Sequence, residues 1–138
     1  MSKSGSMSNG EGWIKIDLHI HTLDDPKDVI DYSAHQLLER AHDLAFGVLA
    51  ITLHDAVFDR AEVFADAAAM GILLIPAAEV RLQGADVIVL NVSRDEIAQL
   101  KTFEDLRRLR TRRDADVCRT ACRDAGSSPG FIFLKKLL

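Results

Sequence analysis

The sequence predicts an α/β fold in which parallel strands alternate with flanking helices. Two continuous apolar runs, at 48–52 and 72–80, are typical of strands buried on both faces, as parallel strands are. Helix-start patterns lie between the expected strands, so the order strand, helix, strand recurs along the chain. The length of 138 residues suits one domain, but a complete barrel of eight strand–helix units takes about 250 residues.

A first strand is expected after a leader without structure. Residues 1–12 are rich in Ser and Gly and nearly free of apolar side chains, so we expect a disordered leader there. Over 14–21 apolar and polar residues alternate at period two, which is typical of a strand with two unlike faces. His19 and His21 are two positions apart and should therefore point to the same side.

Capping patterns predict the helices between the strands. Ser33 with Gln36 makes a capping box, which begins a helix that should end near Gly47. Asp59 with Glu62 repeats the pattern and predicts a second helix through the alanine-rich stretch that follows.

A hairpin and two further helices complete the regular part of the chain. Residues 83–86 predict a turn, and 87–92 predict the strand that follows it. Capping patterns at Ser93 and Thr102 begin two more helices, and the second should turn Phe103 inward and its arginines outward.

Polar side chains lie at the end of each predicted parallel strand. The first strand ends in His19 and His21, and the second runs into His54. The third ends at Glu79. Because the carboxyl ends of parallel strands meet at one edge of a sheet, these side chains should converge. Imidazole nitrogens and carboxylate oxygens are ligands of divalent transition metals, so the sequence predicts a metal site.

Each of these features taken alone has a simpler explanation. Two histidines at i and i+2 can form the polar face of an edge strand, and a buried glutamate can be ion-paired. Three such features at the same position of successive strand–helix units favour the metal site. His35 and His42 lie opposite the apolar stripe of their predicted helix, so we expect them in solvent rather than in a site.

Three strings resemble the first three motifs of the PHP (polymerase and histidinol phosphatase) superfamily: IDLHIHT at 16–22, LAITLHD at 49–55 and GILLIPAAEV at 71–80. In that family a distorted TIM-like (βα) barrel holds two or three Zn, Mn or Fe ions and hydrolyses phosphate esters with metal-activated water. The resemblance implies a partial PHP-type barrel over 13–113, with a phosphate ester as the substrate. Residues 114–138 lack the pattern and are expected to form an atypical tail.

The resemblance also implies roles for individual residues. The metal ligands that it implies are His19, His21, Asp25, Asp28, His54 and Glu79. Glu79 would bridge two ions and, with His54, would belong to the catalytic set. The ion at His54 would take Asp25 or Asp28, with Asp24 a weaker candidate. Asp17 is expected to orient a ligand imidazole from behind.

The later motifs of the family have no counterpart in this chain. They supply further histidines, whereas no histidine follows His54 here, so the chain is a short form or a reading cut short. We therefore expect weak or absent hydrolysis. A non-catalytic binding module with a vestigial metal site is the alternative, and an amidohydrolase is less favoured because those enzymes do not use a glutamate at the position of Glu79.

The distribution of charged and apolar residues indicates which kinds of partner to expect. Residues 1–100 carry 7 Lys or Arg against 16 Asp or Glu, whereas 101–138 carry 10 against 5. The arginines over 107–113 could contact nucleic acid, but without interleaved aromatic residues a solvated helix face is favoured. No apolar run approaches the roughly 18 residues of a membrane span, so we expect a cytoplasmic protein without a membrane partner. Association into a homo-oligomer stays open.

Overall fold

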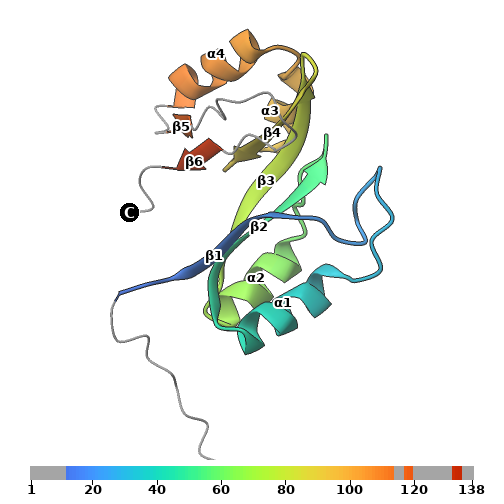
Figure 1. Ribbon diagram of the computed structural model, residues 1–138, viewed down its shortest axis with the longest axis vertical. Coiled ribbons are helices and arrows are strands. Elements are labelled where there is room, and N and C mark those ends of the chain that lie inside the picture. Colours follow the sequence, from blue (N-terminus) through green and yellow to red (C-terminus); the bar gives the residue numbers. More distant parts are fainter. Residues whose placement is uncertain (1–11, 114–116, 120–131, 135–138) are drawn as a thin grey trace, which may run out of the picture.

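The computed structural model describes residues 12–113, 117–119 and 132–134 (Figure 1). Almost all of the expected leader and most of the expected tail therefore lie outside the described residues. Within the described part, the predicted α/β class is confirmed.

A curled sheet of four strands shapes the fold as half of a barrel (Figure 1). Its strands are β1 (Lys15–Ile20), β2 (Phe46–His54), β3 (Leu73–Leu82) and β4 (Ala85–Leu90). They lie side by side in the same order as along the chain. The first three strands are parallel, and β4 returns antiparallel to β3 through a tight hairpin. The carboxyl ends of the three parallel strands thus point to the same edge.

Helices flank the sheet, as the alternating pattern predicts. The described helices are α1 (Ala34–Asp43), α2 (Ala61–Ala69), α3 (Arg94–Gln99) and α4 (Phe103–Arg113). A separate antiparallel pair, β5 (Val117–Arg119) with β6 (Ile132–Leu134), brings β6 next to β4. No helix among the described residues is long and apolar enough to cross a membrane.

The two faces of the sheet bury different apolar residues. On the outer face, Leu49 and Ile51 of β2 pack with Leu38 of α1 and Val63 of α2. The α3–α4 side of the outer face has its own cluster, which includes Leu82 of β3. The inner face buries a third cluster from β2, β3 and β4: Val48, Ala50, Ile75, Ala77, Ile88 and Leu90.

The register of β1 against β2 is shifted twice, and the second shift reverses the first. Lys15 pairs with Phe46, Ile16 with Val48 and Ile20 with Ile51. The first shift places an extra residue, Gly47, in β2, where a Cβ would lie 2.7 Å from a side-chain carbon of Ile14. The second places an extra residue in β1 just before Ile20. A bulge of this kind bends a strand and re-aims its side chains, here next to His19.

Several local predictions are confirmed. Ser33 and Ser93 each form a complete capping box with the residue three positions on. At the start of α4, Thr102 Oγ1 accepts a hydrogen bond from the backbone N–H of Asp105 at 3.2 Å, and the Asp105 carboxylate accepts one from Thr102 N–H. His35 and His42 are exposed on α1, as expected.

Two helix boundaries differ from the prediction. The first helix ends at Asp43 rather than near Gly47, because Ala45 adopts a left-handed φ of 60° and β2 begins at once. The capping box predicted at Asp59 is wrong. Arg60 is the N-cap of α2, without a side-chain hydrogen bond, and Asp59 instead forms an ion pair with Arg94 at 2.9 Å.

The hairpin and the last helix also depart from expectation. The turn is only two residues long, Gln83 and Gly84, with φ values of 47° and 87°. Such a turn matches the twist of the strands it joins, so β4 begins earlier than predicted. Phe103, expected to point inward, is 41% exposed; it is the first residue of α4, and its backbone N–H donates to Gln83 Oε1 at 3.0 Å.

We predict that Thr52→Val destabilises the protein by about 1–3 kcal/mol, because a buried carbonyl loses its donor while the side-chain shape is kept. Thr52 is fully buried, and its hydroxyl donates to the Ile20 carbonyl at 3.2 Å, which ties the end of β1 to β2. Urea unfolding of both proteins measures this difference.

The matched control is Thr111→Val. Its hydroxyl makes a similar bond to the carbonyl of Arg107 at 3.0 Å, but on the exposed face of α4. We expect a change within about 0.5 kcal/mol there. Equal stability of Thr52→Val and wild type would show that this bond does not hold β1.

Candidate metal centre

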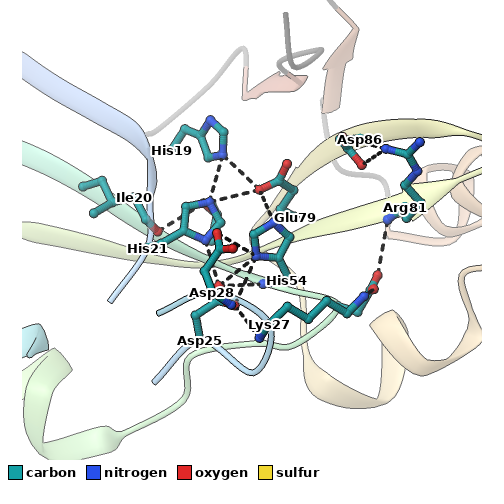
Figure 2. Close-up of polar contacts among 12 residues, drawn as sticks. His19, Ile20, His21, Asp25, Lys27, Asp28, His54, Glu79, Arg81 and Asp86 are labelled. Atoms are coloured by element: carbon teal, nitrogen blue, oxygen red, sulfur yellow. Dashed lines mark hydrogen bonds and ion pairs between the residues drawn. The ribbon is translucent and has the colours of Figure 1, made fainter. Parts of the chain in front are cut away.

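Three strand ends bring the predicted ligands to one edge of the sheet (Figure 2). His19 lies in β1 and His21 just beyond its last residue, while His54 is the last residue of β2. Glu79 lies in β3 and is the register partner of His54. Because alternate residues of a strand share a face, His54 and Glu79 lie on the inner face of the curl, at its open end.

His19, His21 and Glu79 form one group of potential ligands. The Nε2 atoms of both histidines lie 3.0 Å from Glu79 Oε2, and they lie 3.1 Å from each other. Glu79 is only 7% exposed, so its carboxylate depends on these partners rather than on water.

Hydrogen bonding alone does not satisfy this group when Glu79 is ionised. If Nε2 of both histidines carries a proton, two N–H donors face each other. If either Nε2 lacks the proton, that nitrogen and Glu79 Oε2 are two acceptors in contact. A cation among the three atoms removes the conflict. Zinc bonds of about 2.0–2.1 Å in tetrahedral geometry place ligand atoms about 3.3 Å apart, close to the observed spacing. The donor set therefore fits a divalent transition metal.

Asp25 organises a second group with His21, His54 and Asp28. Its Oδ2 lies 2.8 Å from His21 Nδ1 and 3.0 Å from His54 Nδ1. The backbone N–H groups of Lys27, Asp28 and His54 donate to the same carboxylate at 2.8, 3.0 and 3.1 Å. This one buried side chain thus holds the loop after β1 against the end of β2.

These contacts shift two pKa values. Burial by itself raises the pKa of Asp25, but the hydrogen bonds from His21 and from three backbone N–H groups outweigh it and hold the pKa far below its usual range. For His54, burial lowers the pKa, and the carboxylates of Asp25, Glu79 and Asp28 raise it to a net increase. The site is therefore strongly anionic around its imidazoles.

The two groups share residues and meet at Glu79. His21 belongs to both, since Nε2 faces Glu79 and Nδ1 faces Asp25. His54 faces Asp25 through Nδ1, and its Nε2 lies 3.4 Å from Glu79 Oε2. Asp28 is the outermost member, exposed, with Oδ2 3.6 Å from His54 Nδ1. The structure thus brings all six residues of the expected ligand set together.

Two further acidic residues lie outside both ligand groups. The Asp17 carboxylate accepts a hydrogen bond from the backbone N–H of His19 at 3.2 Å and so supports the bulged strand, and its expected role behind an imidazole stays a prediction. Asp24 accepts from the hydroxyl of Thr22 and faces Arg60 at 3.7 Å, away from both ligand groups.

Sequence reasoning assigned no role to Lys27 or Asp55, which border the centre. Asp55 Oδ2 pairs with Lys27 Nζ, while its Oδ1 accepts from the backbone N–H of Arg81 at 3.2 Å. Asp55 N–H donates to the Glu79 carbonyl at 2.8 Å, and Asp55 adopts a left-handed φ of 50°. The one sequence signal for Asp55 was its position directly after His54. No sequence signal pointed to Lys27.

We predict that the purified protein retains a divalent transition metal through His19, His21 and Glu79. Elemental analysis after dialysis should find Zn, Mn or Fe in the wild type, and about one-tenth of that level or less in the double variant His19→Ala, His21→Ala.

The control is the double variant His35→Ala, His42→Ala, which removes the same residue type from the exposed face of α1. Its metal content should equal that of the wild type. A wild type that retains no more metal than the first double variant would overturn the assignment of this centre.

Comparisons with known proteins do not identify a family. No family model matches the chain, and the search of curated proteins found no match. The resemblance to the PHP superfamily therefore rests on three short motifs, and the assignment of the centre rests on its geometry.

Proposed function

We propose that this protein is a metal-dependent phosphoesterase of the PHP type, which hydrolyses a phosphate ester with activated water. One observation carries the proposal: two groups of ligands share His21 and meet at the carboxylate of Glu79. Neighbouring ion sites of this kind are the arrangement used for phosphoryl hydrolysis, with the ions about 3.5–4 Å apart.

The ligand set is consistent with this chemistry. His19, His21 and Glu79 would hold one ion, and His54 with Asp25 or Asp28 would hold another. Bound divalent ions supply a Lewis acid that lowers the pKa of water and offsets charge on the phosphoryl oxygens.

The residues of the chain itself contribute position and charge. Asp25 keeps His21 and His54 in fixed orientation, since it contacts Nδ1 of both rings and leaves Nε2 of both directed toward Glu79. Where Asp28 rather than Asp25 is the ligand of the second ion, Asp25 would act as the carboxylate that fixes which imidazole nitrogen faces a metal. Glu79 approaches both groups and would join the two ions.

We expect the turnover of this chain to be slow. The ligands come from three strand ends, and no histidine follows His54 to supply the further ligands of the family. A metal-binding module without catalysis would have the same ligands, so turnover and metal content need to be measured on the same samples.

We predict slow hydrolysis of 4-nitrophenyl phosphate by the Mn²⁺- or Zn²⁺-loaded protein, reduced at least about 100-fold by Glu79→Gln. Glutamine keeps the shape of the side chain and removes the charge that bridges the two groups. Release of nitrophenol, measured with the metal content of each sample, tests this.

His35→Ala is the control and should keep the wild-type rate, because His35 lies on α1 and pairs with Asp66 rather than with the centre. Turnover that survives Glu79→Gln would contradict the proposed site. Metal retention without any turnover would favour the non-catalytic module, and robust turnover abolished by Glu79→Gln would show that no further ligands are needed.

A further inference from the structure

A second feature is a cavity of about 430 Å³ beside the carboxyl end of β2, close in sequence to the metal ligands. The loop after β2 lines one side of the cavity. Helix α3 and the residues directly after it line the other. Its apolar lining comes from Val57, Val80, Ile97 and Leu100, which belong to the α3–α4 cluster of the core. The cavity is therefore built on packed residues of the fold.

The charged lining of this cavity is mainly basic. Arg81, Arg94 and Lys101 contribute three cations, against one carboxylate from Asp55. Asp55 is already paired with Lys27 and also accepts the backbone N–H of Arg81, so its charge is balanced from outside the cavity. The lining residues are therefore mainly basic, although Arg81 and Arg94 each face a carboxylate outside the lining, Asp86 and Asp59.

The three cations are available to a ligand. Arg81 and Arg94 are paired with Asp86 and Asp59, but their side chains are 60% and 73% exposed, and surface pairs of this kind contribute only about 0–1 kcal/mol. Among the residues that the structure describes, no acidic side chain forms an ion pair with Lys101. An arriving anion can compete with Asp86 and Asp59 for the arginines and can pair with Lys101.

Two residues of the cavity lining lie close in sequence to metal ligands. Asp55 directly follows His54 on β2, and Arg81 lies two residues beyond Glu79 on β3. Residues two apart on a strand share a face and are separated by about 7 Å, so Arg81 lies one such step from Glu79. Figure 2 shows the Arg81 side chain directed toward Asp86, farther along β3 than Glu79.

We propose that this cavity binds a second anionic group of the substrate, so that the substrate is a phosphate ester whose organic part carries a further phosphate or carboxylate. The apolar floor suits a short carbon chain between the two anions. This inference rests on the proposed function, since the first phosphate is taken to lie at the metal centre.

Two non-hydrolysable probes test the proposal: butylphosphonate, with one anionic end, and butane-1,4-bisphosphonate, with two. Calorimetric titration of the full, Mn²⁺-loaded chain should show about tenfold tighter binding of the bisphosphonate, beyond the factor of about two for its two equivalent ends. Lys101→Gln and Arg81→Gln should each reduce this preference to about threefold or less. Both variants should bind butylphosphonate as the wild type does.

Arg107→Gln is the matched control, because Arg107 is an exposed arginine of α4 outside the cavity lining. It should leave the affinity for both probes unchanged. A preference that persists in both Lys101→Gln and Arg81→Gln, or that falls equally in Arg107→Gln, would overturn the cavity as the anion site.

The two proposals fail in different ways. If the metal-loaded wild type binds butylphosphonate but shows no preference for the bisphosphonate, the cavity proposal is wrong and the proposed function stands. If it binds neither probe, the metal centre does not take phosphoryl groups, and both proposals are overturned.

Discussion

The parallel pairing of β2 with β3 is the constraint on which the rest of the structure depends. Its register runs without a break from Val48↔Leu73 to His54↔Glu79, so an imidazole and a carboxylate meet at the last pair. A slip of either strand by one residue would send its own ligand to the opposite face, where the core packs against helices. The apolar inner face below them makes such a slip costly, because it buries Ala50 and Ala77 completely. Packing in the middle of the strands thus positions the chemistry at their ends.

The loop after β1 depends on a single buried carboxylate. Asp25 is 8% exposed and has three backbone donors and two imidazoles around it. A buried charge without such partners would cost several kcal/mol, whereas with them it holds the loop, β2 and both ligand groups in one arrangement. The anionic centre that results needs a counter-charge, and a divalent cation is the counter-charge that also fits the spacing of its donor atoms.

The charged residues change from mainly acidic in the ligand groups to mainly basic in the cavity lining at the border of the centre. Asp55 lies between Lys27 on one side and the backbone of Arg81 on the other, and the basic cavity begins beyond it. A carboxylate in this position separates the acidic ligand groups from the mainly basic lining of the cavity. The left-handed backbone of Asp55 lets the chain leave β2 toward α2 while its N–H still reaches the carbonyl of Glu79. Positioning of the ligands and shaping of the cavity therefore share the same residue.

By itself the sequence determined the α/β class, the helix starts at Ser33 and Ser93, and the convergence of His19, His21, His54 and Glu79, because periodicity, capping and strand ends are local properties. It could not choose between Asp25 and Asp28, since both follow His21 in one loop. The tertiary structure made Asp25 the buried partner of two imidazoles and left Asp28 at the rim. It also decided the cap of α2, where Asp59 pairs with a distant arginine, and the cavity at Arg81 and Lys101, whose lining residues are far apart in sequence. Contacts between distant segments depend on how the sheet curls, and no local pattern encodes that.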